Sequence, residues 1–174
     1  MRRLAQLGEI MQIAYVPADF EAALGFWTDT MGVGPFYLQD ISLPGLRYYG
    51  EPSAPLFSVA IAYWGEVQIE LIVQHNDAPS IYRDWRDAGG EGVHHVCILV
   101  ADIEEARRVA LEAGGTVAQE AIGPDYGVLY VDTGGGPGTL LELVQPSPGM
   151  RARFARIRAD AEGWDGTEPL RRFG

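Results

Sequence analysis

The sequence predicts an α+β protein with two tandem βαβββ modules, which pair into a cup-shaped mixed sheet with helices outside. Two internal repeats support this fold class. Segment 12–23 resembles segment 95–106 at an offset of 83 residues, and the strand pattern around Glu70 recurs around Glu142 at an offset of 72 residues. Three strands after one helix cannot close a core alone, so the two copies are expected to pair and bury both sheets.

The first module is expected to span residues 1–74. Loose apolar alternation predicts its first strand, and Asp19 is placed to cap the helix that follows. The stretch 40–55 is rich in Pro and Gly and is expected to be an exposed connection. The predicted elements are a strand at 9–16, a helix at 20–31, a strand from 36, and a hairpin of strands at 57–64 and 67–74.

The second module, at 92–148, repeats this order after a linker at 75–91. Asp102 takes the place of Asp19 as the predicted helix cap. The predicted elements are a short linker helix near 80–88, a strand at 93–100, a helix at 103–113, and strands at 116–121, 127–132 and 139–145. Residues 149–174 are expected to form an amphipathic helix, over 149–164, and a polar tail.

Composition excludes several classes of protein. The chain has 174 residues and a net charge of −11, so it should repel nucleic acid. No apolar run approaches the roughly 20 residues of a membrane helix, and no signal peptide is apparent. Cys97 is the single cysteine, which excludes an intrachain disulfide framework and fits a cytoplasmic protein. All 13 basic residues are Arg, which excludes a Schiff-base lysine and a P-loop.

Charge is uneven along the chain. The segment after residue 149 is net basic, whereas the rest is strongly acidic. The arginines between Arg151 and Arg158 are interpreted as a solvated helix face. The alternative is that they bind an anionic substrate tail such as a CoA phosphate.

Four polar side chains occupy matched positions in the predicted strands. Gln12 and His95 open the first strand of each module, and Glu70 and Glu142 lie within apolar strands near the module ends. A buried glutamate needs a cation, a hydrogen-bond partner or a proton, because an unpaired buried charge is costly. A divalent metal would satisfy both glutamates, with the His95 nitrogen and the Gln12 carbonyl oxygen completing the ligand set.

Each of these residues also has an ordinary structural interpretation. Gln12 could be a polar residue at a strand edge, and His95 could be a satisfied core histidine. The glutamates could pair with Arg47 or Arg83. His94 is expected to face the helix side of the sheet and to be structural. The matched positions of all four residues nevertheless favour a metal site.

The sequence resembles the vicinal oxygen chelate superfamily, which includes glyoxalase I, methylmalonyl-CoA epimerase, extradiol dioxygenases and bleomycin-resistance proteins. The resemblance spans about residues 9–146. It implies a cup with metal ligands from the first and last strand of each module, here Gln12, Glu70, His95 and Glu142. This set is similar to that of animal-type glyoxalase I. The matching motifs are Gln12-x6-Asp19, Trp27 through Gly34-Pro35-Phe36, Glu70, His95-x6-Asp102 and Glu142.

The resemblance implies a Zn²⁺, Ni²⁺, Co²⁺ or Mn²⁺ cofactor that chelates a substrate carbonyl and stabilises an enediolate. It implies Glu142 as the base and Glu70 as the second proton carrier. The expected function is that of an isomerase, epimerase or lyase acting on an acyl-CoA or another small carbonyl compound. The resemblance also implies a homodimer.

Three other functions occur within the superfamily that the sequence resembles. Glyoxalase I-type isomerisation of a hemithioacetal fits the ligands, but Val16, Gln74 and Glu91 stand where glutathione-using members have their glutathione contacts. A small-molecule binding protein of the bleomycin-resistance type, without catalysis, is the alternative from another class, against which four intact ligand positions argue. Extradiol dioxygenase chemistry needs two histidines, and Gln12 replaces the first of them.

Overall fold

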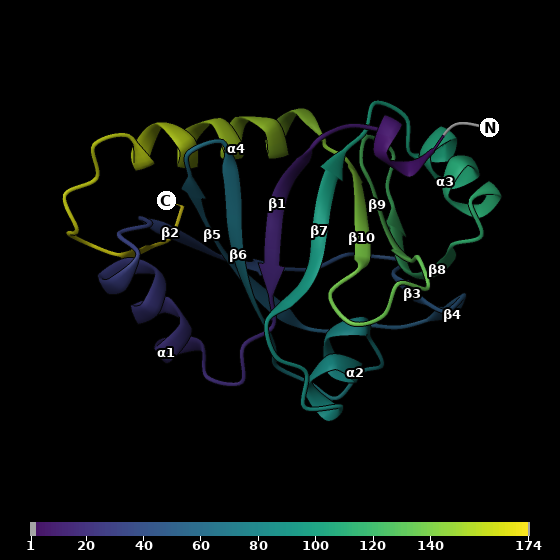
Figure 1. Cartoon of the computed structure of the whole chain (residues 1–174), viewed down its shortest axis with the longest axis horizontal. Helices are drawn as coiled ribbons and strands as arrows, with labels where there is room; N and C mark the ends of the chain where they lie inside the picture. The colour runs from purple at the N-terminus through teal and green to yellow at the C-terminus, as the bar shows by residue number, and fades with distance from the viewer. Residues whose placement is uncertain (1–2, 174) are drawn as a thin grey trace.

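The computed structural model describes residues 3–173, whose strands join in one curved mixed sheet with helices around it (Figure 1). This confirms the predicted fold class. The strands are β1 (Ile10–Tyr15), β2 (Phe36–Ile41), β3 (Arg47–Tyr48), β4 (Glu51–Pro52), β5 (Phe57–Trp64), β6 (Val67–Gln74), β7 (Val93–Leu99), β8 (Thr116–Ile122), β9 (Gly127–Asp132), β10 (Leu140–Gln145) and β11 (Leu170–Arg171). The helices are α1 (Phe20–Gly25), which continues as a π-helical segment (Phe26–Thr30), α2 (Ile81–Asp87), α3 (Ile103–Glu112) and α4 (Pro148–Ala161), with a 3-10 turn at Leu4–Gln6.

The centre of the sheet is formed by the first and last strands of the two sequence repeats. The strand order is β11-β2-β5-β6-β1-β7-β10-β9-β8-β3-β4. β1 pairs antiparallel with β7, and each also pairs in parallel with the last strand of its own repeat, β6 or β10. The four strands that contain the predicted ligands are therefore adjacent.

The two faces of these central strands have different roles. Ile69 and Leu71 of β6 belong to an apolar cluster with the α1 segment, and Ile98 of β7 belongs to a cluster with α3. Leu71 is fully buried, a burial that stabilises the fold by about 1.5–3 kcal/mol. Because side chains alternate along a strand, the intervening residues face the concave side of the sheet. Glu70 is one of these residues.

Both predicted helix caps are present. The Asp19 carboxylate accepts a hydrogen bond of 3.0 Å from the Ala22 N–H at the start of α1. The Asp102 carboxylate accepts hydrogen bonds of 2.9 and 3.0 Å from the N–H groups of Glu104 and Glu105 at the start of α3. These bonds satisfy backbone donors that a helix leaves unpaired in its first turn.

The prediction of an exposed connection over residues 40–55 is wrong in part. β3 and β4 form a short hairpin, and β3 pairs with β8 of the other half of the chain. Leu46, beside this hairpin, is only 2% exposed. The polar tail likewise contains β11, which pairs in parallel with β2. Two-residue strands are too short to have a periodic sequence pattern. Pairing with strands that are distant in sequence, β8 for β3 and β2 for β11, therefore decides where they form.

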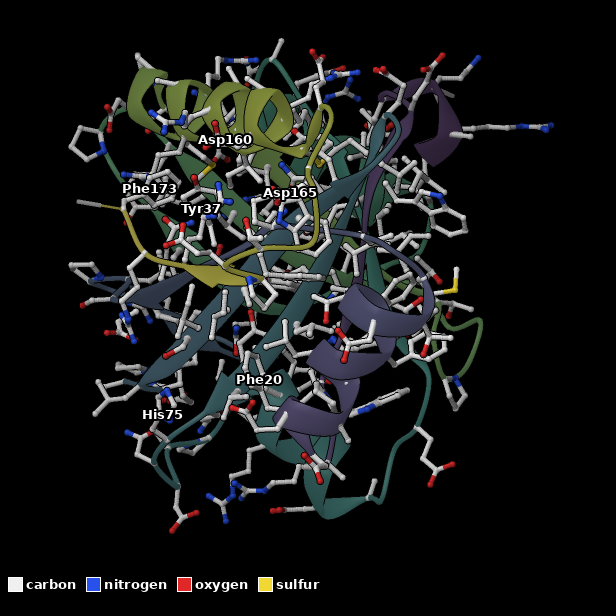
Figure 2. The ribbon with its side chains drawn as sticks, turned by 90° about the vertical axis from the view of Figure 1, so that its left-hand side faces the viewer. Phe20, Tyr37, His75, Asp160, Asp165 and Phe173 are labelled. Carbon is white, nitrogen blue, oxygen red and sulfur yellow. The ribbon has the colours of Figure 1, made fainter. Side chains whose placement is uncertain are left out.

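Helix α4 crosses the sheet near β5 and is not fully solvated (Figure 1). Ile157 is completely buried, and Phe154 packs against the same cluster as β5 residues. The chain then returns along the sheet edge, where the Phe173 ring stacks on Tyr37 at 4.6 Å between centroids (Figure 2). The Tyr37 hydroxyl also donates to Asp160 of α4, so the C-terminal segment is tied to β2 at two points.

Among the described residues, no helix is both long enough and apolar enough to cross a membrane.

Candidate metal centre

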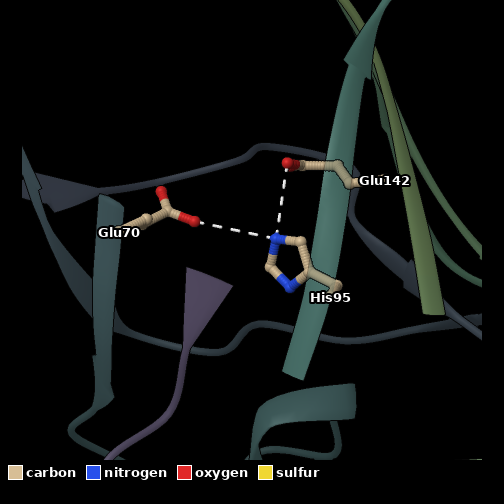
Figure 3. A group of neighbouring side chains, drawn as sticks. All are labelled: Glu70, His95 and Glu142. Atoms are coloured by element: carbon tan, nitrogen blue, oxygen red, sulfur yellow. Dashed lines mark ion pairs between the residues drawn. The ribbon is translucent and has the colours of Figure 1, made fainter. Parts of the chain in front are cut away.

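Three of the predicted ligands converge on the concave face of the sheet (Figure 3). The Nε2 atom of His95 lies 3.4 Å from Glu142 Oε2 and 3.7 Å from Glu70 Oε2. One ligand atom from each side chain can be chosen so that all lie within 4.8 Å of one another. His95 is fully buried, and each glutamate is 7% exposed. Three separate strands, β6, β7 and β10, supply the group.

The donor set fits a divalent cation. His95 Nε2 is buried and has no hydrogen-bond partner within residues 3–173, although two carboxylates face it. Leaving such a buried polar atom unpartnered costs about 1–3 kcal/mol, which a bound cation would remove. One imidazole nitrogen and carboxylate oxygens are ligands that Zn²⁺ and the neighbouring first-row metals accept.

Gln12, the fourth predicted ligand, lines the same cavity as Glu70 and Glu142. Its Nε2 donates a 2.8 Å hydrogen bond to Gln68 Oε1, and Gln68 Nε2 donates to the Tyr63 hydroxyl at 2.9 Å. The first of these hydrogen bonds engages the side-chain amide nitrogen of Gln12. The side-chain carbonyl oxygen of Gln12 is then the atom able to ligate a cation. Gln68 was not predicted as part of the site.

His94 contacts His95 directly, although its position in the sequence predicts a structural side chain on the helix side of the sheet. Their Nδ1 atoms are 2.8 Å apart, and His94 Nε2 lies 3.3 Å from the Ile81 carbonyl oxygen. The pairing of β7 with β1 shifts register here, since Ala14 pairs with His95 and Tyr15 with Val93. His94 is thus the extra residue of a β-bulge, which redirects its side chain. In the sequence, the pair of adjacent histidines is the feature that could have indicated this contact.

The His94 contacts define the hydrogen positions on both rings. A carbonyl oxygen can only accept, so His94 Nε2 carries a hydrogen. Burial, together with the neighbouring His95 ring, lowers the pKa of His94 to about 3, so this ring is neutral and its Nδ1 accepts. His95 Nδ1 must then donate to His94 Nδ1, and in the neutral ring that ligates a metal the lone pair of Nε2 faces the two glutamates.

The two glutamates have different surroundings. Burial, and then the charge of Glu142, raises the pKa of Glu70 well above its usual value. Burial acts on Glu142 in the same direction. His95, whose Nε2 lies 3.4 Å from Glu142, nevertheless holds the pKa of Glu142 below its usual value, together with the nearby Tyr130 and Cys97 side chains. Without a cation, Glu142 therefore remains the carboxylate of the pair.

The proposed arginine partners of the glutamates bind elsewhere. Arg83 pairs with Asp87 of its own helix at 3.2 Å. Arg47 donates to the carbonyl oxygen of Gly50 at 2.7 Å. The purely structural interpretation, in which an arginine neutralises Glu70 or Glu142, is thus not supported.

The candidate centre opens on a cavity of about 710 Å³ between the two halves of the sheet and α4. Gln12, Glu70 and Glu142 form part of its wall, and most of the remaining wall is apolar. Tyr82 and Tyr130 also line it, and their hydroxyls are hydrogen-bonded to each other at 2.8 Å. The arrangement can hold a cation beside a space large enough for an organic substrate.

A curved sheet of two matched halves around a buried histidine and two glutamates defines a glyoxalase-like fold. The chain belongs to the Glyoxalase/Bleomycin resistance protein/Dioxygenase superfamily, whose family model matches residues 11–131. A search of the curated proteins finds no match.

Solved structures with the same fold include two methylmalonyl-CoA epimerases. The epimerase from Mycobacterium tuberculosis is 17% identical, with 82% of this chain and 91% of that chain covered and a TM-score of 0.56. A variant of the Streptomyces coelicolor epimerase, in complex with 2-nitronate-propionyl-CoA, is 20% identical, with 82% and 96% covered and a TM-score of 0.55. A hypothetical protein from Bacillus halodurans C-125 is 21% identical, with 80% and 94% covered and a TM-score of 0.60. At these identities the likeness concerns the fold.

Proposed function

We propose that this protein is a divalent-metal-dependent isomerase, epimerase or lyase that removes a proton next to a carbonyl group. The observation that supports it is the buried group of Glu70, His95 and Glu142, which opens on a cavity of about 710 Å³. The epimerase neighbours, one of them in complex with an acyl-CoA analogue, make a CoA thioester one substrate class to test.

Gln12, Glu70, His95 and Glu142 would hold the metal, with Zn²⁺, Ni²⁺, Co²⁺ and Mn²⁺ as candidates. When bound, the cation would act as a Lewis acid that polarises the substrate carbonyl. The apolar wall of the cavity would exclude water from the acidic α-carbon.

In this proposal Glu142 removes the proton. Its carboxylate takes the hydrogen of the α-carbon, and the C–H electron pair moves towards the carbonyl oxygen. Glu70, in its protonated form, then returns a proton, to the neighbouring carbon in an isomerisation or to the opposite face in an epimerisation. Exchange with solvent afterwards removes the proton from Glu142 and restores the one on Glu70. The pKa of Glu142, which His95, Tyr130 and Cys97 hold below its usual value, keeps this side chain ionised and supports its role as the carboxylate that takes the proton.

A metal-free binding protein of the bleomycin-resistance type is the second candidate, because the cavity wall is mostly apolar. Metal analysis of protein purified without chelator distinguishes the two. We expect one divalent metal per chain, and a site that stays empty with added Zn²⁺, Ni²⁺, Co²⁺ and Mn²⁺ would contradict the enzyme proposal.

Replacement of the base tests the chemistry directly. We expect Glu142→Gln to keep the fold and to abolish solvent deuterium exchange into α-carbonyl thioesters and hemithioacetals, measured by NMR. The hemithioacetals in the panel also test glyoxalase I-type isomerisation. Exchange at the native rate in Glu142→Gln would assign the base to another residue.

A further inference from the structure

The cavity beside the candidate metal centre has different chemistry at its two ends. Glu70 and Glu142 are buried, whereas Arg153 of α4, which also lines the cavity, is exposed. Between them the wall is formed by apolar side chains from both halves of the sheet and from α4, among them Phe57, Val59, Val128, Val144, Met150 and Phe154. A ligand in this space would extend from a buried acidic group, across apolar surface, to a cation.

Arg153 is the one basic residue among the described residues that line the cavity, and the structure gives it no carboxylate partner. Two later arginines of α4 differ from it. Arg156 pairs with Asp160 at 2.7 Å, and Arg158 pairs with Glu66. In an acidic protein with 24 Asp and Glu residues, a cation left unpaired at a cavity is available to a ligand.

The remaining acidic side chain that lines the cavity, besides Glu70 and Glu142, is already paired. Asp40 accepts from the Ser58 hydroxyl at 2.6 Å and from Arg172 at 3.2 Å. Both contacts lower the pKa of Asp40, so its charge persists and would oppose additional negative charge on a ligand. One arginine without a carboxylate partner, Arg153, and one aspartate that stays charged, Asp40, suit a ligand with a single negative charge.

We propose that the substrate is an apolar carbonyl compound with one anionic group, which Arg153 binds while the carbonyl lies at the Glu70–His95–Glu142 end. This rests on the proposed function for the position of the carbonyl. The volume of about 710 Å³ falls within the roughly 300–1,000 Å³ of sites that bury organic ligands of moderate size. A CoA thioester, with its several phosphate charges, would need more cations than the wall supplies.

Two synthetic probes test this class. Both are phenylalkyl hydroxamates, whose hydroxamate chelates a metal, and they differ only at the far end, which is a carboxylate in one and a carboxamide in the other. Titration calorimetry on Zn²⁺-loaded protein measures the ratio of their dissociation constants. We expect the carboxylate to bind about fivefold more tightly to the native protein, as for a partly exposed charge pair.

Two arginine variants on the same helix provide the comparison. Arg153→Gln should reduce the ratio to about one, whereas Arg151→Gln, which removes an exposed arginine outside the cavity wall, should leave it unchanged. Equal binding of both probes to the native protein, or an unchanged ratio in Arg153→Gln, would overturn the inference. Tighter binding of CoA than of the carboxylate probe, lost in Arg153→Gln, would overturn the single-charge class. Failure of both probes to bind Zn²⁺-loaded protein would instead contradict the proposed metal function.

Discussion

At the scale of single residues, the site depends on a histidine that is not itself a candidate ligand. His94 accepts from His95 Nδ1 and so directs the lone pair of His95 Nε2 at Glu70 and Glu142. Its own position is fixed by the Ile81 carbonyl and by edge contact with the Trp85 ring at 5.1 Å. Such partners of a ligating histidine fix its tautomer and orientation.

Replacing His94 should therefore weaken metal binding. We expect His94→Phe to reduce Zn²⁺ affinity about 10- to 100-fold, because His95 loses the acceptor that selects its tautomer. His94→Gln, whose amide oxygen can accept, should recover part of the affinity. Competition with a chromogenic chelator measures both values. If the two variants lose affinity equally while their metal-free melting temperatures match, the role of His94 is packing and not orientation.

At the scale of elements, the repeated helices begin in the same way. An aspartate after the first strand of each repeat accepts from the backbone of the next helix, at Asp19 and at Asp102. The strands then place one proposed ligand each beside the cavity, so the elements act as rigid supports for the candidate site. Helix α4 belongs to neither repeat, and it adds a wall to the cavity.

The cap of α3 offers a direct test of this arrangement. Asp102→Ala should lower the free energy of unfolding by about 1 kcal/mol, because two N–H groups lose their acceptor. Asp102→Asn retains an acceptor oxygen and should stay close to the native value. Urea denaturation measures the difference. Zn²⁺ affinity should be unchanged in both, and a large loss of affinity would mean that α3 positions the site.

At the scale of the whole molecule, the two halves meet where two buried carboxylates face each other. Burial, and then the charge of Glu142, raises the pKa of Glu70 when no cation is present. A carboxyl group with a raised folded-state pKa contributes its stability below the unfolded-state pKa, and that contribution is lost as pH rises through the folded-state value. A bound cation has the opposite dependence, since acid displaces it from its ligands.

The stabilisation by metal should consequently grow with pH. We expect the difference in melting temperature between Zn²⁺-loaded and chelator-treated protein to increase between about pH 5 and pH 8. Glu70→Gln removes the titrating group, and the chelator-treated variant should lose most of the pH dependence. A difference that is constant across this range would show that Glu70 does not carry a proton in the metal-free protein.

The repeat in the sequence determined the fold class, the order of the main elements, both aspartate caps and the residues that meet in the candidate centre. These features follow from periodicity and spacing, which are local properties of the chain. The β3–β4 hairpin against β8, the return of β11 to β2, and the bulge that brings His94 to His95 depend on partners distant in sequence. Only the tertiary structure decided these features, because two-residue strands and a one-residue register shift are stabilised by contacts with distant parts of the chain and not by their own sequence. For the same reason it alone placed Arg153 at the cavity, where the sequence suggested a solvated helix face and, as the alternative, arginines that bind an anionic substrate tail.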